Sequence, residues 1–279
     1  MGDHPLRPGL DLLGGVGLLL MLVGAAAYAL LLALTHDRGW PRWRTAAWLI
    51  GSVVAAGAVL GPLATAAHTG YPAHMVVHLL LGMAAPVLFA LAAPLTLLLR
   101  ALPVRRARRV SHLLSSRPLR VLTEPVVAAV LVVAGMGVLY ATPLYAAMHR
   151  HPLLHLAVHV HLFAAGYLFT VAIVGRDPMP HRRGYGHRSV VLVLSLAAHD
   201  IAAKYLYAHP PVAVDAPAAH LGAMIMYYGG DVVDVILMVL LGTRWYRSSG
   251  RRSFGPSSVQ LPHPPARNLV RCRPQPGWK

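Results

Sequence analysis

The chain alternates between long apolar runs and short stretches that are rich in arginine. Apolar runs of about twenty residues are long enough to cross the hydrocarbon core of a bilayer as helices. We therefore expect an all-α polytopic membrane protein in which residues 1–243 form one transmembrane domain. The runs predict seven transmembrane helices, at approximately residues 12–34, 46–67, 74–99, 124–142, 152–174, 189–208 and 218–243.

Two segments depart from a simple apolar pattern. Pro86 and Pro94 interrupt the third predicted span, and a proline inside a helix removes a backbone hydrogen bond and kinks the helix. The carbonyl groups freed by these kinks need partners within the protein or in a water-filled cavity. After the last span, residues 244–279 are rich in arginine, proline and serine without a periodic apolar face. That composition is typical of a disordered tail.

Composition supports the membrane class, and the arginines predict an orientation. Only 12% of the residues are charged and 56% are apolar, whereas about a quarter of a soluble protein is charged. The net charge of +16 comes from arginines in the loops after spans one, three and five and at the start of the tail; the alternate loops contain only Arg150 and the N-terminus only Arg7. The positive-inside rule then places the N-terminus outside and the basic tail in the cytoplasm. Because topology accounts for the charge, we expect no nucleic-acid partner.

One stretch, residues 149–161, contains five histidines and leads directly into the fifth span. Ionisable side chains inside a membrane are candidates for function. His155 and His159 are four residues apart and share one helix face, whereas His161 is about 200° round the helix from His159 and should face elsewhere. The other histidines near the outer face are expected to lie in the wet interface, where they only collect or exchange ions: His68, His149 and His151.

Two further spans carry ligand-type residues at the same spacing. His74 and His78 share a face of the third span, and His220 and Met224 share a face of the seventh. At a rise of 1.5 Å per residue, the deeper member of each pair lies roughly 7–10 Å below the outer membrane boundary. His199 in the sixth span lies about 14 Å deep by the same arithmetic. Four helices therefore bring metal-binding side chains to similar depth on the outer side.

Imidazole and thioether groups together favour copper, and the thioether favours Cu(I) in particular. Imidazole alone also accepts zinc or haem iron. The single cysteine, Cys272, rules out a site built from paired thiolates within the chain. We therefore predict a copper site. Its expected ligands, with the first three as the principal set, are His78, His155, His159, His74, His199, His220 and Met224.

Four charged residues lie within the last two spans. Asp200 and Lys204 are four residues apart in the sixth span and are expected to form an internal pair. Asp200 could instead orient an imidazole ligand. Asp231 and Asp234 in the seventh span are expected to pair with arginines or with backbone groups from the inner side.

Several blocks of the sequence resemble, in the same order, the motifs of the CtaG family of cytochrome c oxidase assembly factors, the caa3 type. The resemblance covers approximately residues 65–245. The matching blocks are His74-Met-Val-Val-His78, Ala85-Pro86, Ala93-Pro94 with Arg100-Ala-Leu-Pro103, His151-Pro-Leu-Leu-His155 with His159, Gly166-Tyr-Leu-Phe169, Asp177-Pro178, His199 and Gly222-Ala-Met224-Ile-Met226.

This resemblance implies a non-enzymatic, multi-pass protein of the bacterial plasma membrane that is needed for assembly of the respiratory oxidase, through copper delivery or maturation of a copper centre. Its implied partners are the lipid bilayer and either cytochrome c oxidase subunits or a copper donor protein. The sequence departs from the family before the last motif. Many relatives have Asp-Gln-Gln where this chain has Ala218-Ala-His220, and an aromatic-Pro-Gly stretch is replaced by Tyr227-Tyr-Gly-Gly-Asp231. His220 is then a substitute ligand.

Two other classes of function remain open from the sequence. A b-type cytochrome would hold haem between His78 and His159, and a Soret absorption band would identify it. A transporter of metal ions or protons would use Asp200 and Asp231 as relay groups. It would require polar side chains that continue from the outer site to the inner face.

Overall fold

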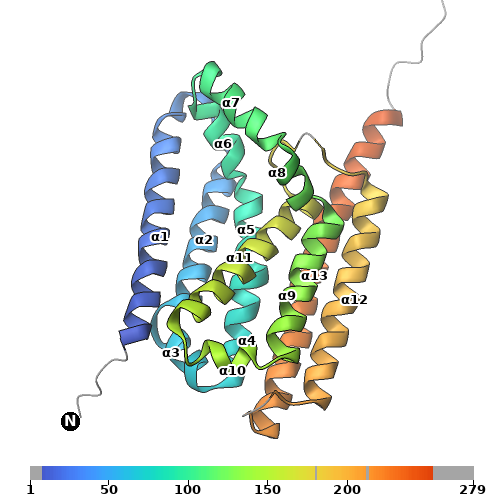
Figure 1. Ribbon diagram of the computed structural model, residues 1–279. Coiled ribbons are helices and arrows are strands. Elements are labelled where there is room, and N and C mark those ends of the chain that lie inside the picture. The colour runs from blue at the N-terminus through green and yellow to red at the C-terminus, as the bar shows by residue number, and fades with distance from the viewer. Residues whose placement is uncertain (1–7, 180, 212–213, 254–279) are drawn as a thin grey trace, which may run out of the picture.

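The computed structural model describes residues 8–179, 181–211 and 214–253, and within them all regular structure is helical (Figure 1). By length and composition, five helices are able to cross a membrane, or six if a bent pair counts as one span. The chain is therefore a multi-pass helical membrane protein. The predicted total of seven additionally requires the 17-residue apolar helix α9, Pro125–Ala141, to cross.

The helices follow the predicted spans in chain order. Their bounds are α1 Pro8–Ala33, α2 Arg42–Val59 with α3 Gly61–Thr69, α4 Tyr71–Leu79 with η2 Leu80–Ala84, α5 Ala85–Ala92 and α6 Pro94–Ala101, then α9, α11 Pro152–Val174, α12 Tyr185–Ala208 and α13 Ala216–Ser253. Short helices connect them: η1 His36–Arg38, α7 Val104–Leu114, α8 Arg117–Leu122 and α10 Leu144–Met148. Figure 1 places α7 and α8 at one end of the bundle and α3 and α10 at the other. We call these the α7–α8 end and the α10 end.

The second predicted span is bent. Helices α2 and α3 meet at an angle of 42°, and the bend occurs at Gly61, whose φ is 75°. Glycine adopts positive φ without the steric cost that a side chain imposes. The bend directs α3 toward the start of α4 at the α10 end.

The third predicted span is broken at both of its prolines, which confirms the predicted kinks. Pro86 follows a π-helical turn, Leu80–Ala84, and Pro94 follows Ala93, which has a φ of 54°. A proline cannot donate a backbone hydrogen bond, so the ladder is interrupted before each of them. The π turn was not predicted; such turns occur frequently at functional sites.

The break at Ala93 leaves the first amide groups of α6 without partners inside the helix. Asp177, from the loop after α11, supplies them. Its carboxylate accepts hydrogen bonds from the Thr96 amide at 2.7 Å, the Thr96 hydroxyl at 2.7 Å and the Leu95 amide at 3.4 Å. Burial raises the pKa of the Asp177 carboxyl, and these hydrogen bonds oppose that shift. The loop after α11 is thereby attached to the broken third span.

Two arginines bond the free carbonyl groups at the C-terminal end of α11. Arg188 donates to the Ile173 carbonyl at 2.9 Å, and Arg244 donates to the Gly175 carbonyl at 2.8 Å. A helix C-terminus presents carbonyl groups without helical partners, and cationic side chains also complement its dipole. These two bonds tie α11 to α12 and α13 at the α7–α8 end.

Helix α11 packs directly on the π turn through two glycines. A Cβ atom on Gly166 would overlap the carbonyl oxygen of Gly82, and a Cβ on Gly82 would lie 2.7 Å from Leu162 Cδ1. Small residues allow helices to approach closely where lipid provides no hydrophobic driving force. This contact fixes the position of α11, and with it the position of its histidines.

The prediction that the tail is disordered from residue 244 needs correction. Helix α13 continues through residues 244–253, and no proline occurs between Pro217 and Pro256. Without a proline to end it, the helix extends past the apolar run, and Arg244 anchors it to α11. The remainder of the tail, 254–279, lies outside the described residues.

Substituting Gly166 with alanine is expected to destabilise the fold by about 1–3 kcal/mol or more, because the new methyl group would overlap backbone on the π turn. Gly137 in α9 has open space at its Cβ position, so Gly137→Ala is the matched control and should change stability by no more than about 1 kcal/mol. Thermal unfolding in detergent measures both. Equal unfolding temperatures for the two variants would contradict the close packing described above.

Asp177→Ala is expected to destabilise the protein by about 1–3 kcal/mol, since it removes a helix cap and leaves buried amides without partners. Asp37→Ala provides the control, because Asp37 is exposed and its ion pair among the described residues is with the exposed His36. The same unfolding assay applies. A loss of stability as large for Asp37→Ala as for Asp177→Ala would show that the effect is not one of capping.

Candidate metal centre

Helix α11 presents two histidines on one face, as predicted. The ring centroids of His155 and His159 are 4.4 Å apart, and His68 from α3 lies 4.5 Å from His155. All three rings border a cavity of about 470 Å³ that is otherwise lined almost entirely by apolar side chains of α1, α2, α4 and α11. The bend at α3 brings His68 to the two α11 histidines.

Two more histidines complete this group. His149, at the C-terminal end of α10, lies 5.9 Å from His155 and 6.2 Å from His74 by ring centroids. His74, on α4, is 4% exposed and lies 6.5 Å from His159. We call this group the five-histidine cluster; its members are His68, His74, His149, His155 and His159.

Hydrogen bonds orient two rings of the cluster. His149 Nδ1 donates to the Tyr145 carbonyl at 2.8 Å, and His159 Nδ1 donates to the His155 carbonyl at 3.0 Å. Because a carbonyl oxygen can only accept, Nδ1 carries the proton in each ring and Nε2 keeps its lone pair. Metal-binding histidines are commonly held in this way, with one nitrogen bonded to a carbonyl and the other free to bind the ion.

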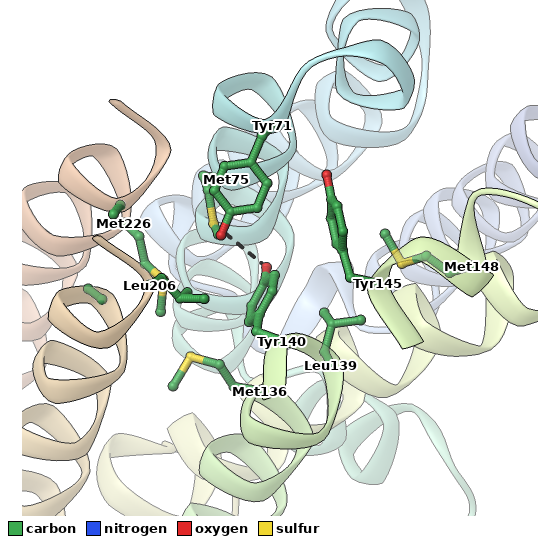
Figure 2. Packing of buried hydrophobic residues seen from close by; sticks show 11 residues of the cluster. Tyr71, Met75, Met136, Leu139, Tyr140, Tyr145, Met148, Leu206 and Met226 are labelled. Carbon is green, nitrogen blue, oxygen red and sulfur yellow. Dashed lines mark hydrogen bonds between the residues drawn. The ribbon is translucent and has the colours of Figure 1, made fainter. Parts of the chain in front are cut away.

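Tyrosines and methionines form a shell beside the cluster. Tyr140 lies next to His74, with 3.1 Å between its hydroxyl and His74 Nε2, and donates to Met75 Sδ at 3.6 Å. Figure 2 shows the Tyr140 hydroxyl directed toward Met75 on α4, with the Tyr145 ring beside Tyr71. Burial raises the pKa of Tyr145 to about 12, so its phenol stays neutral at physiological pH. The shell therefore supplies packing and neutral hydrogen-bonding groups.

His78 interacts electrostatically with His159, but among the described residues no ring contact joins His78 to His155 or His159. The histidine ring that packs against His78 is that of His199, with centroids 6.2 Å apart, and His74 takes the place beside His159. The predicted set is thus divided between two groups, one around α11 and one between α4 and α12.

Two predicted ligands lie apart from both groups. His220 stacks on Tyr207 with centroids 4.2 Å apart, and Met224 is 42% exposed on the surface of α13. His161 faces away from His159, as predicted, and its Nε2 donates to the Leu131 carbonyl at 3.2 Å. These positions favour packing or solvent contacts over a shared site.

The sequence alone assigned too small a role to His68 and His149. Both belong to the five-histidine cluster, because the bend before α3 and the short helix α10 return the chain over the end of α11. Tyr140 and Tyr145, for which the sequence predicted no role in a metal site, lie against His74. The sequence signal for this arrangement was the proximity of aromatic residues to the histidine-rich stretch.

The predicted internal pair of Asp200 and Lys204 is not among the ion pairs of the described residues. The Lys204 ammonium lies 5.1 Å from the centre of the Tyr227 ring. Asp234 is 4% exposed, and its Oδ2 atom has no hydrogen-bond partner. No arginine or backbone group therefore satisfies that oxygen as expected.

The histidine groups are not arranged as a finished coordination site. Among the described residues, no three His, Cys, Asp or Glu side chains already converge closely enough to hold one metal ion. The ring centroids within the five-histidine cluster lie 4.4–6.5 Å apart, and an ion would need the ring nitrogens directed at it from about 2.0–2.1 Å. Ion binding therefore requires rotation of side chains within the cluster.

Comparison with known proteins supplies the family. The profile of the cytochrome c oxidase caa3 assembly factor family (Caa3_CtaG) matches residues 26–248. Similar curated proteins, each described as uncharacterized, occur in Mycobacterium bovis and Mycobacterium tuberculosis, both 31% identical over 262 residues, and in Mycobacterium leprae, 29% identical over 234 residues.

These alignments cover 86%, 86% and 76% of this chain but only 39%, 39% and 35% of the relatives, so the chain spans about two-fifths of their length. No solved structure matches. The family match nevertheless extends from the last turns of α1 into α13 and includes every member of the five-histidine cluster. The chain belongs to the cytochrome c oxidase caa3 assembly factor family.

Proposed function

We propose that the protein assists assembly of a caa3-type cytochrome c oxidase by binding copper at the outer face of the bacterial plasma membrane and passing it to an oxidase subunit. The observation that carries this proposal is the five-histidine cluster, in which α3, α4, α10 and α11 bring imidazoles together at one end of the bundle. Imidazole nitrogen suits copper, and binding and release of an ion require no catalytic residue.

The arrangement of the bundle supports an outer location for this site. The arginine-rich helices α7 and α8 lie at the end opposite α3 and α10 (Figure 1). Arginine-rich segments remain on the cytoplasmic side of a membrane. The α10 end, with the cluster, then faces outward, where oxidase subunits and copper donor proteins would meet it.

Exchange of the ion is favoured by the same geometry. His155 and His159 border a cavity of about 470 Å³ between α1 and α11, which leaves room beside both rings for an ion to enter and leave. His149 sits at the end of the short helix α10, which carries only five residues. A cluster with partly spaced rings and accessible members suits transient binding better than permanent storage.

A transporter is less well supported. The half of the bundle toward the α7–α8 end is filled by a buried apolar cluster that includes Phe169, Ile173, Leu192 and Leu237. A path for ions or protons would need polar groups there. The buried side chains of Asp177 and Arg188 in this half are occupied by hydrogen bonds to backbone groups, so an ion that enters at the α10 end is expected to leave from it.

Replacing His155 and His159 together with alanine is expected to remove one bound Cu(I) ion per chain, weakening binding by on the order of 100-fold or more. Changes to groups that merely support a ligand already cost about 10–100-fold, so loss of two ligands should cost at least as much. The measurement is copper content after loading purified protein with Cu(I) under reducing conditions.

The matched control replaces two histidines at the other end, His36 and His112, with alanine; both lie outside the cluster. Oxidase activity in cells that carry each variant as their only copy provides the functional readout. We expect activity to fall to the level of a deletion strain for the cluster variant and to stay normal for the control. Full copper content or full oxidase activity in the cluster variant would refute the proposal.

A further inference from the structure

A second group of buried polar side chains lies deeper in the bundle. His78 on α4, His199 on α12 and Asp234 on α13 are 5%, 6% and 4% exposed. All three border a second cavity of about 480 Å³, which lies between α9, α11, α12 and α13. This cavity is separate from the one beside the five-histidine cluster, which none of the three residues borders.

These three side chains contain polar atoms that nothing in the described protein satisfies. His78 Nδ1, both ring nitrogens of His199 and Asp234 Oδ2 are buried without hydrogen-bond partners. Burying such groups without partners is unfavourable, and most buried polar groups in native proteins are paired. In contrast, His149, His159 and His161 each have a ring nitrogen bonded to a carbonyl. The deep group is therefore distinguished by its lack of internal partners.

The backbone makes room for this group. A Cβ atom on Gly230 of α13 would overlap the His199 ring, so the imidazole is packed against bare backbone. Asp234 follows Gly230 by one helical turn, and residues at this spacing share a face. The two imidazole planes of His78 and His199 are within 11° of parallel.

Further carboxyl groups lie near this cavity. Asp231 interacts electrostatically with His199, and Asp200 and Asp231 interact with Asp234. Lys204 interacts electrostatically with Asp200, but among the ion pairs of the described residues, none joins these carboxylates to an arginine or lysine. Asp234 thus has no basic side chain paired with it in the part of the chain that the structure describes. Buried charges normally pair or bind a metal.

We propose that His78, His199 and Asp234 form a second metal site that binds a divalent transition-metal ion. Two imidazoles and one carboxylate are a common ligand set for zinc and for neighbouring divalent metals. At metal–nitrogen distances of about 2.0–2.1 Å, two imidazoles on one ion have centroids roughly 5–6 Å apart. The observed 6.2 Å between His78 and His199 is close to that spacing, and binding would require the two rings and Asp234 to turn toward one ion. The carboxylate distinguishes this site chemically from the all-imidazole cluster above it.

Cobalt(II) is a suitable probe, because it substitutes for zinc and gives visible d–d absorption that reports its ligands. The titration uses the full-length chain purified in detergent. It is carried out in wild type and in the His155→Ala, His159→Ala background, where the five-histidine cluster is disabled. We expect one equivalent of cobalt with visible bands to remain in that background. Adding either His199→Gln or Asp234→Asn to this double-alanine background should weaken cobalt binding by at least about tenfold.

The matched control is His161→Gln, which alters a histidine that borders the same cavity but already bonds to a carbonyl. It should leave the cobalt spectrum unchanged. Circular dichroism and size-exclusion chromatography verify that each variant is folded, and Asp234→Glu, which keeps the carboxylate, should retain binding. Zinc, measured by elemental analysis, should compete with cobalt for the same single equivalent.

Several outcomes would overturn the proposal. One is an unchanged cobalt spectrum in both His199→Gln and Asp234→Asn. Another is a loss of cobalt binding in His161→Gln as large as in those two variants. The third is a Soret band that depends on His199, which would assign the ring pair to haem iron. Failure here is separable from failure of the proposed copper function. The copper assay depends on His155 and His159, whereas this assay is read out in a chain that lacks both.

Discussion

The structure depends on one constraint: inside hydrocarbon, every polar group must find its partner within the protein. Leaving a buried donor or acceptor unsatisfied costs about 1–3 kcal/mol. The broken third span meets this constraint because Asp177 reaches the free amides of α6. The C-terminal end of α11 meets it because Arg188 and Arg244 bond its last carbonyls. Irregular backbone is thus tolerated where side chains distant in sequence complete its hydrogen bonds.

The same constraint separates the histidines into two kinds. In the five-histidine cluster, carbonyl groups hold Nδ1 of His149 and His159, which leaves Nε2 available. In the deeper group, His199 has no partner at either nitrogen. A ring that is already held can bind an ion weakly and release it without leaving buried groups unsatisfied. A ring without partners gains more from an ion that stays, so the two proposals correspond to exchange in the first group and retention in the second.

Hydropathy and proline positions were sufficient to predict the order of the helices and the breaks of the third span, because both follow from local chemistry. The faces were also predictable, since residues four apart share a face in any helix. Depth was not. The estimate assumed helices perpendicular to the membrane, but α11 crosses the bundle diagonally in Figure 1. A tilted helix descends less per residue, so His159 lies beside His74 and leaves His78 to pair with His199.

The location of the apolar core limits what the two sites can do together. Phe169, Ile173 and Leu192 belong to a buried apolar cluster toward the α7–α8 end, where the buried polar residues Asp177 and Arg188 are bonded to backbone groups. From the centre, a chain of contacts leads from His78 through Tyr140 to His74 in the five-histidine cluster. Under the proposed function, metal would enter and leave by this path at the α10 end. Such one-sided access is what an assembly factor requires, because its cargo must return to the face where the nascent oxidase is completed.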